Sequence, residues 1–447
     1  MERDMTKGSP ARMIFHFTVP VFIGNVFQQF YSMVDTVIVG QFVGTDALAA
    51  VGSTSTINFL IIGFLTGLTA GLTVLTSQRF GAGDMQGMRK TVGSAAIISL
   101  VLSILMTMIS MLGMSHLLRI MNTPENIFKD AYAYIMIICA GIGAQVLYNL
   151  QAGILRALGN SKTPLYFLIL AAVLNMILDL VFIIVFQMGA PGAAVATVIS
   201  QGVSGVLCLV YIIKKVPVLK LHKEDWRLDG TLVKMQLGIG LPMALQYSIT
   251  AIGTIMVQSA LNKLGSVAVA GFTAANKIEQ VVTQAYVAMG TTMATYCAQN
   301  TGRYDRERIR KGFRAATAMG IVYSIVAGLL VAFFGRYMTY LFVSENVSDI
   351  VSYVDIYLKC VTTFFIPLTI VNLYRNGIQG MGYGLLPMMA GVAELIGRGV
   401  VAVIASGQGN YFGICMASPV AWVLAGGLLL IMYYGIMKSH VASGKKA

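Results

Sequence analysis

Long apolar runs recur along the whole chain, and they constrain its fold more than any other feature of the sequence. Each run is long enough to cross a bilayer as one α-helix, which needs roughly 20 mainly apolar residues. Hydrophobic residues make up 57% of the 447 residues and charged residues 11%. We therefore predict an all-α integral membrane protein with twelve membrane-spanning helices. The runs cover residues 14–42, 53–80, 93–115, 128–157, 164–187, 190–215, 233–262, 272–300, 313–335, 350–380, 385–407 and 411–437.

Twelve spans would place both chain ends on the same side of the bilayer. Twenty-four lysines and arginines lie on the side of the N-terminus, and four, namely Arg119, Lys129, Lys263 and Arg336, lie on the other. Basic loops stay in the cytoplasm, so we expect a multi-pass protein of the cytoplasmic membrane with both termini cytoplasmic. The net charge of +13 fits this orientation. Because the basic residues are not interleaved with aromatic ones, we expect no nucleic-acid partner. We also expect a monomer.

The two halves of the chain resemble each other. Four glycines recur 219 residues later, and an Asn, a Gly and a Pro recur 223 residues later. The pairs are Gly52 with Gly271, Gly71 with Gly290, Gly83 with Gly302, Gly93 with Gly312, Asn149 with Asn372, Gly159 with Gly382, and Pro164 with Pro387. Six spans per half predict two lobes related by a pseudo-two-fold axis along the membrane normal. We expect an N-lobe at 1–215, a cytoplasmic linker loop at 216–232 and a C-lobe at 233–447.

Two acidic residues of the N-terminal half, Asp35 and Asp179, lie inside apolar runs without a local basic partner. A carboxylate in that position is costly unless it meets a partner, water or an ion. Asn175 precedes Asp179 by four residues and so shares its helical face. Two lone acids in one half of a membrane protein predict a cation site.

Further polar residues on other runs, Asn149 and Thr197, extend this set. Oxygen ligands from Asp35, Asn175, Asp179 and Thr197 would suit Na⁺, whereas paired acids away from water would also suit H⁺. The alternative is a group of buried polar side chains that only tie helices together. The five cysteines and four histidines lack the spacing of metal ligands, so we expect no other metal and no cofactor.

Three other features are candidates for a functional role. Pro20 lies in the first run, where it removes a backbone hydrogen bond; it is either a permanent kink or a bend that responds to Asp35. Glu394 and Arg398 are one helical turn apart and predict a structural ion pair. Glu279 has no such partner, so it either lines a cavity or reaches Arg398 across helices.

The whole pattern resembles the multidrug and toxic-compound extrusion (MATE) family over essentially the full chain. The most specific match is Asn175-Met-Ile-Leu-Asp179, and Asn149-Leu-Gln-Ala-Gly153 supports it. The resemblance to the prokaryotic branch implies that the residues at 35, 175, 179 and 197 form a cation site in the N-lobe. It also implies that Tyr134 and Asn149 extend the network of that site. One family asparagine falls on Ala152, where this sequence departs from the pattern.

The resemblance implies a secondary antiporter, not an enzyme, that exports amphipathic or cationic organic compounds in exchange for H⁺ or Na⁺. No nucleotide-binding motif is present in the sequence, so an ion gradient is the expected energy source. A lipid-linked oligosaccharide flippase of the same superfamily is the nearest alternative, and it would need a basic central cavity. A membrane-embedded transferase would need clustered His or Asp-rich motifs. A channel would pass current without a fixed exchange ratio.

Overall fold

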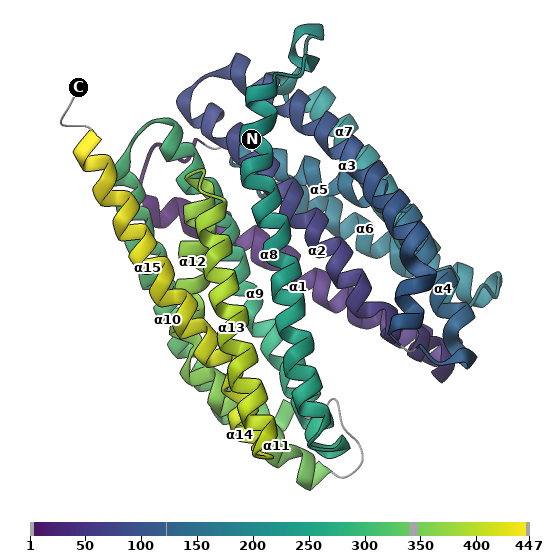
Figure 1. The fold of residues 1–447 in the computed structure, drawn as a ribbon. Helices are drawn as coiled ribbons and strands as arrows, with labels where there is room; N and C mark the ends of the chain where they lie inside the picture. The colour runs from purple at the N-terminus through teal and green to yellow at the C-terminus, as the bar shows by residue number, and fades with distance from the viewer. Residues whose placement is uncertain (1–3, 122, 339–346, 444–447) are drawn as a thin grey trace. The chain divides into compact units, whose positions relative to one another are not determined.

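The computed structural model of the protein describes residues 4–121, 123–338 and 347–443 (Figure 1). These residues form helices and no strand, which confirms the all-α prediction for the described part of the chain. The helices are α1 (Pro10–Phe42), α2 (Thr45–Ala82), α3 (Met85–Ile120), α4 (Glu125–Ala140), α5 (Ile142–Ala157), α6 (Lys162–Leu180), the π-helix η1 (Val181–Val185), α7 (Ala190–Lys215), the 3₁₀ helices η2 (Pro217–Leu219) and η3 (Lys223–Trp226), α8 (Gly230–Asn262), α9 (Ser266–Gly302), α10 (Arg306–Met338), α11 (Val347–Thr363), α12 (Phe365–Gly380), α13 (Leu385–Gly407), α14 (Tyr411–Cys415) and α15 (Ala417–Ser443).

Within the described residues, eight helices are long and apolar enough to cross a membrane, and two bent pairs raise the number to as many as ten. The pairs are α4 with α5, bent by 46°, and α11 with α12, bent by 53°. Each pair occupies one run that the sequence predicted as a single helix. At the first break, Gly141 approaches α7 so closely that a Cβ atom would lie 2.2 Å from the Val198 side chain. The bend therefore occurs where only glycine fits between the helices.

Residue contacts divide the chain into two compact units. The N-terminal unit contains Ile23–Ala244, and the C-terminal unit contains Met5–Phe22 with Leu245–Ala447. These bounds differ from the lobes expected at 1–215 and 233–447, because α1 and α8 each change unit part way along their length.

Both changes of unit occur two residues after a proline inside a helix. Pro20 lies in α1, whose residues belong to the N-terminal unit from Ile23 onward, and Pro242 lies in α8, which leaves that unit after Ala244. A proline inside a helix lacks the N–H that would bond one turn back, so the helix is weakened there. α1 and α8 each consist of two segments that pack in different units.

The first segment of α8 is tied closely into the N-terminal unit. Gly240 lies against α2, where a Cβ on Gly71 would be only 2.5 Å from the Gly240 Cα. The Gln236 side chain donates hydrogen bonds to the carbonyls of Leu72 (3.2 Å) and Thr91 (2.9 Å). Because these bonds satisfy the buried amide nitrogen of Gln236 between three helices, they fix the register of α8 on α2 and α3.

The first segment of α1 is tied into the C-terminal unit in a similar way. The Thr18 and Thr292 hydroxyls are 2.8 Å apart, which joins α1 to α9. Ahead of the helix, the backbone N–H of Met5 donates to Gln299 Oε1 at 2.8 Å, and Arg308 donates to the Gly8 carbonyl at 2.8 Å. The chain is therefore anchored to this unit before α1 begins.

The segment 216–232, expected as a linker loop, carries the two short helices η2 and η3 and packs against α3. Asp225 is buried, and its carboxylate lies 3.4 Å from Arg89 of α3. A Cβ on Gly93 would lie 2.3 Å from the Asp225 carbonyl oxygen, so η3 rests directly on the helix backbone. This segment is part of the N-terminal unit and not a free connection.

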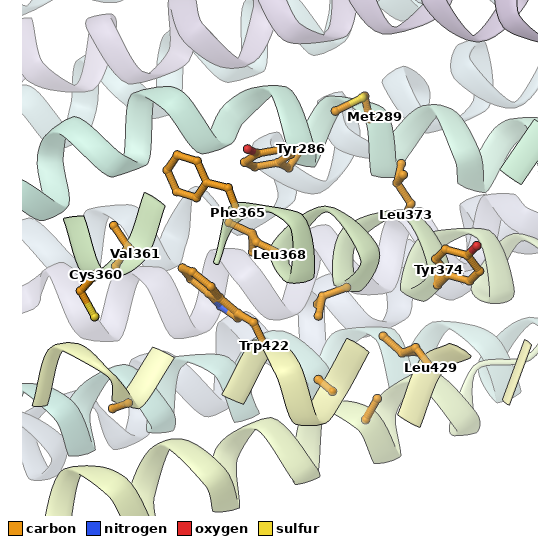
Figure 2. Close-up of a cluster of buried hydrophobic side chains, with 14 of the residues drawn as sticks. Tyr286, Met289, Cys360, Val361, Phe365, Leu368, Leu373, Tyr374, Trp422 and Leu429 are labelled. Carbon is orange, nitrogen blue, oxygen red and sulfur yellow. The ribbon is translucent and has the colours of Figure 1, made fainter. Parts of the chain in front are cut away.

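The C-terminal unit is held together by a core of aromatic and aliphatic side chains from α9, α11, α12 and α15 (Figure 2). Tyr286 of α9 lies edge-on to Phe365 of α12, with ring centroids 5.7 Å apart. Trp422 and Leu429 close the cluster from α15. This packing places the polar side chains of α9 at the border of the core.

Candidate cation site in the N-terminal unit

The six residues predicted to form a cation site all belong to the N-terminal unit and come from five of its helices. They are Asp35 of α1, Tyr134 of α4, Asn149 of α5, Asn175 and Asp179 of α6, and Thr197 of α7. Asn175 and Asp179 are buried, with relative exposures of 1% and 0%. The helical spacing of four residues puts them on one face, as the sequence predicted.

Asn175 links Asp179 to α7. With its amide placed so that both ends find partners, Asn175 Nδ2 donates to Asp179 Oδ2 at 3.0 Å. In the same placement Asn175 Oδ1 accepts from the Thr197 backbone N–H at 3.1 Å and lies 3.2 Å from the Thr197 hydroxyl. The hydroxyl itself donates to the Ala193 carbonyl at 3.0 Å. These bonds fix the orientation of the Asp179 carboxyl group.

The carboxyl groups of Asp35 and Asp179 interact through a side-chain hydrogen bond and through their charges. Two carboxylates cannot form such a bond unless one of them carries a proton, since an ionised carboxylate only accepts. Asp35 Oδ1 and Asp179 Oδ1 are both shielded from solvent and have no donor partner in the described structure. None of the ion pairs among described residues includes either acid. The pair therefore requires a proton or another cation.

Tyr31, which the sequence analysis missed, belongs to this site. It precedes Asp35 by one helical turn, its hydroxyl is hydrogen bonded with the Thr197 side chain, and it lies within electrostatic range of both carboxyls. Tyr134 is buried and lies within the same range of Asp35 and Tyr31. The four-residue spacing of Tyr31 and Asp35 was the available signal in the sequence.

Asn149 is half-buried, and its Nδ2 is closed off from solvent without a hydrogen-bond partner in the described structure. No described hydrogen bond joins it to the two acids. Ala152, where the family pattern has an asparagine, is fully buried. The structure therefore brings together Asp35, Asn175, Asp179, Thr197 and Tyr134, with Asn149 outside their hydrogen-bond network.

A π-helical turn follows the site. η1 begins at Val181, two residues after Asp179, and its wider turn ends the regular hydrogen bonding of α6. Single π-turns are frequent at functional sites because they leave backbone groups able to rearrange. The described residues contain no group of three or more His, Cys, Asp or Glu side chains that would hold a metal ion.

In the C-terminal unit, Glu394 and Arg398 form the expected ion pair at 2.8 Å. A second arginine, Arg375, binds the other oxygen of Glu394 at 2.6 Å. Arg375, one of the twenty-four basic residues counted on the side of the N-terminus, lies within α12, and its side chain is only 12% exposed. Its partner stands 19 residues away on another helix, so no local pattern pointed to the pair.

Glu279 does not reach Arg398 directly. Its Oε2 accepts a short hydrogen bond from the Tyr357 hydroxyl of α11, and Arg398 acts on it only through space. Of the two roles expected from the sequence, the reach to Arg398 across helices is electrostatic, with no ion pair between the two residues in the described structure, and cavity lining stays a prediction.

Comparisons with known proteins place the chain among transporters. A family model described as MatE matches residues 20–181 and 239–404. The Bacillus subtilis protein named probable multidrug resistance protein YpnP is 32% identical over 388 residues, 86% of each chain. A second protein of that species, probable multidrug resistance protein YoeA, is 29% identical over 76% of this chain and 75% of its own. A structure described as the outward-facing conformation of a multidrug resistance MATE family transporter has the same fold, with a TM-score of 0.92 at 22% identity over 98% of both chains.

Proposed function

Because the chain belongs to the MatE family of transporters, the multidrug and toxic-compound extrusion proteins, we propose that it exports amphipathic, cationic organic compounds in exchange for H⁺ or Na⁺. Members of this family are transporters and not enzymes. Relatives named as multidrug resistance proteins support drug export, and they do not favour the oligosaccharide flippase or the transferase. The observation that carries the exchange mechanism is the contact between Asp35 and Asp179.

The coupling ion binds at this pair of acids. With both carboxyls ionised, their mutual repulsion in a site closed off from water is large, so one cation must be present in the resting site. A proton would bridge the two carboxyls. Na⁺ would take oxygens of Asp35, Asn175, Asp179 and Thr197, which are the hard ligands that it prefers. The Tyr31 and Tyr134 hydroxyls lie beside either ion.

Binding of the ion changes how α1 packs against α6 and α7. The acids belong to separate helices, so a cation between them draws α1 toward α6, and its loss lets the two charges push the helices apart. Pro20 lies fifteen residues before Asp35 and offers the weak point at which α1 bends in response. Cargo is released as a consequence of this change in the N-terminal unit.

Twelve spans with both termini in the cytoplasm complete the proposal. α1 and α9 join the eight single spans and the two bent pairs, because their polar residues, such as Asp35 and Glu279, face the protein interior. The excess of basic residues on the side of the N-terminus supports a cytoplasmic location for both ends. Arg3, Lys445 and Lys446, which contribute to this excess, lie outside the described residues. The protein works as a monomer without a cofactor.

The test is efflux from membrane vesicles loaded with a fluorescent organic cation and driven separately by a pH gradient and by a Na⁺ gradient. We expect one of the two gradients to drive efflux. Asp35→Asn and Asp179→Asn should each reduce the driven rate to background, because an amide cannot take up a proton and binds Na⁺ more weakly. Asp130→Asn, which alters an exposed acid on α4, is the matched control and should leave the rate unchanged.

Undiminished driven transport in either acid variant would refute the coupling role of the pair. Efflux in the wild-type protein that neither gradient accelerates would refute antiport altogether. Size-exclusion profiles of the purified variants should match the wild-type profile, which separates loss of coupling from loss of folding.

A further inference from the structure

α9 carries a polar stripe along its accessible face. The stripe consists of exposed or half-buried residues at successive spacings of three and four: Thr273, Lys277, Gln280, Gln284, Val287 and Thr291. Five of these six side chains are polar. A helix face that touched lipid would be apolar, because hydrocarbon cannot hydrogen bond with such groups. The stripe therefore faces water or cargo.

α10, in the same unit, shows the opposite pattern. Between Gly320 and Phe334 its exposed side chains are apolar, as expected for a helix that faces lipid, and include Val322, Ile325, Leu329, Leu330 and Phe333. The contrast between the two helices indicates that a polar accessible face is specific to α9 and is not shared by all helices of the unit.

Glu279 lies beside this stripe, with 9% of its surface exposed. Its Oε2 is bonded to the Tyr357 hydroxyl. Its second oxygen, Oε1, takes part in no described hydrogen bond, and it is not among the buried atoms left without a partner in the described structure. This oxygen is therefore not fully closed off from solvent, and it can accept a further hydrogen bond.

An aromatic ring and an amide contact Tyr357, the residue that is bonded to Glu279. Phe272 and Tyr357 form an edge-to-face pair, with ring centroids 4.6 Å apart. Asn276 lies one turn before Gln280, accepts a hydrogen bond from it at 2.7 Å and donates to the Tyr357 hydroxyl at 3.3 Å. A carboxylate next to aromatic rings is the arrangement that binds organic cations, since the rings attract positive charge and also contact apolar groups.

We propose that Glu279 binds the positive group of an organic cation in the C-terminal unit, with Phe272 and Tyr357 contacting its apolar part. This assignment rests on the proposed export of organic cations, but it does not depend on which ion drives transport. It adds a cargo contact that lies in a different unit from the paired acids of α1 and α6.

The competing explanation is that Glu279 only balances the charge of Arg398. Glu394 is already bound by Arg375 and Arg398, so the three groups together carry one excess positive charge. However, no described ion pair joins Glu279 to either arginine. Lys277, the other charged residue nearby on α9, lies two positions earlier and points to a different side of the helix. Among the described groups, therefore, no basic side chain forms an ion pair that neutralises Glu279.

The experiment compares two probes that share three phenyl groups on phosphorus. Tetraphenylphosphonium is a permanent cation, and triphenylphosphine oxide is neutral. Binding of each to the purified full-length protein is measured by equilibrium dialysis without any ion gradient. We expect Glu279→Gln to weaken tetraphenylphosphonium binding at least tenfold and to change triphenylphosphine oxide binding less than twofold. Glu279→Asp, which restores the charge, should recover part of the cation affinity.

The matched control is Glu307→Gln, which removes an exposed carboxylate from α10 in the same unit and should alter neither affinity. The proposal is overturned if Glu279→Gln binds the cation as the wild type does, or if the wild type does not bind it. It is also overturned if the variant loses both probes equally and melts at a lower temperature, since that result indicates charge balance with Arg398. Failure of gradient-driven efflux would instead refute the proposed antiport and leave this binding result intact.

Discussion

Asp35 and Asp179 lie in the interior of the N-terminal unit, where an ionised carboxylate is costly. Each acid brings one unsatisfied oxygen into a space closed off from solvent, and each interacts with the other acid. Among the described residues, Asn175 donates to the pair through Asp179 Oδ2. The uncompensated acids therefore favour a bound cation, and few other groups of the site could neutralise their charge.

Tyr31 should support the site without being essential to it. Tyr31→Phe removes the hydroxyl that is hydrogen bonded with Thr197 but leaves both carboxyls in place. We expect the driven efflux rate to fall severalfold and to stay above that of Asp35→Asn, as measured by initial rates in vesicles. Tyr166→Phe, which changes an exposed tyrosine of α6, is the control. A rate equal to the wild type would exclude Tyr31 from the site.

Asp84 allows a prediction about stability and pH. It caps α3, with its Oδ1 accepting from the Gly87 N–H at 2.8 Å and its Oδ2 from Arg79 at 2.6 Å. The Gly87 hydrogen bond, with a smaller effect of Arg79, holds the pKa of Asp84 below its ordinary value of 3.8. The ionised cap therefore stabilises the fold above pH 3.8, and this contribution is lost as the pH falls through the lowered pKa.

We expect Asp84→Ala to destabilise the protein by at most about 1 kcal/mol at pH 7, because an N-cap is lost at an exposed position. The melting-temperature difference from the wild type should be constant between pH 7 and pH 5 and should shrink below pH 3.8. Asp84→Asn keeps a capping oxygen and should lose less. A difference that grows on acidification would contradict the assignment of the cap.

The residues of the site differ in how readily they could be predicted from the sequence. The spacing of Asn175 and Asp179 in an apolar run indicated their common face, and the structure has them hydrogen bonded. Tyr31 was missed because a tyrosine in an apolar run is usually a packing residue. The ion pair of Arg375 was not predicted because its partner Glu394 lies on another helix, and pairing between helices leaves no local pattern.

At the scale of the helix, α1 and α8 share the same arrangement. Each contains an interior proline, and each passes from one compact unit to the other two residues after it. The proline removes one backbone hydrogen bond, so the helix bends more easily there. This is also where its two segments begin to pack in different units. The similarity suggests that Pro242 has the same role in α8 that Pro20 has in α1.

We therefore expect Pro20→Ala and Pro242→Ala each to slow driven efflux while leaving cargo binding within about twofold of the wild type. Alanine restores the backbone hydrogen bond and straightens the helix, which opposes bending but leaves the binding side chains in place. Pro191→Ala is the control, because that proline lies in the first turn of α7, where no helical hydrogen bond is lost.

Vesicle efflux and equilibrium binding, measured on the same preparations, decide between the outcomes. Unchanged efflux in Pro242→Ala would show that α8 does not bend during transport. Equal loss of binding and efflux would point to misfolding instead of a hinge.

At the scale of the whole molecule, neither half of the sequence contains a complete unit. The N-terminal unit needs Gly230–Ala244 from the second half, which supplies Gln236 and Gly240 against α2. The C-terminal unit needs Met5–Phe22 from the first half, which supplies Thr18 against α9. Each half therefore contributes a segment to the core of the other unit.

Dividing the gene after Leu228, an exposed residue beyond η3, tests this exchange. We expect fragments 1–228 and 229–447 to be degraded or to aggregate when expressed singly, because each unit then lacks a packed segment. Expressed together, they should co-purify and show cation efflux. The measurements are co-purification through a tag on one fragment and vesicle transport. A stable, monodisperse 1–228 fragment would contradict the exchange.

The sequence by itself indicated the class of the protein and predicted a candidate cation site. The lengths of the apolar runs require helices in a membrane, and the cost of an acid in such a run marks Asp35 and Asp179. Tertiary structure alone decided which helix segments form each unit, where the two long runs break, and that Arg375 joins Arg398 at Glu394. Those outcomes depend on contacts between residues far apart in the chain, whereas span length and the cost of charge are local properties that composition and spacing already express.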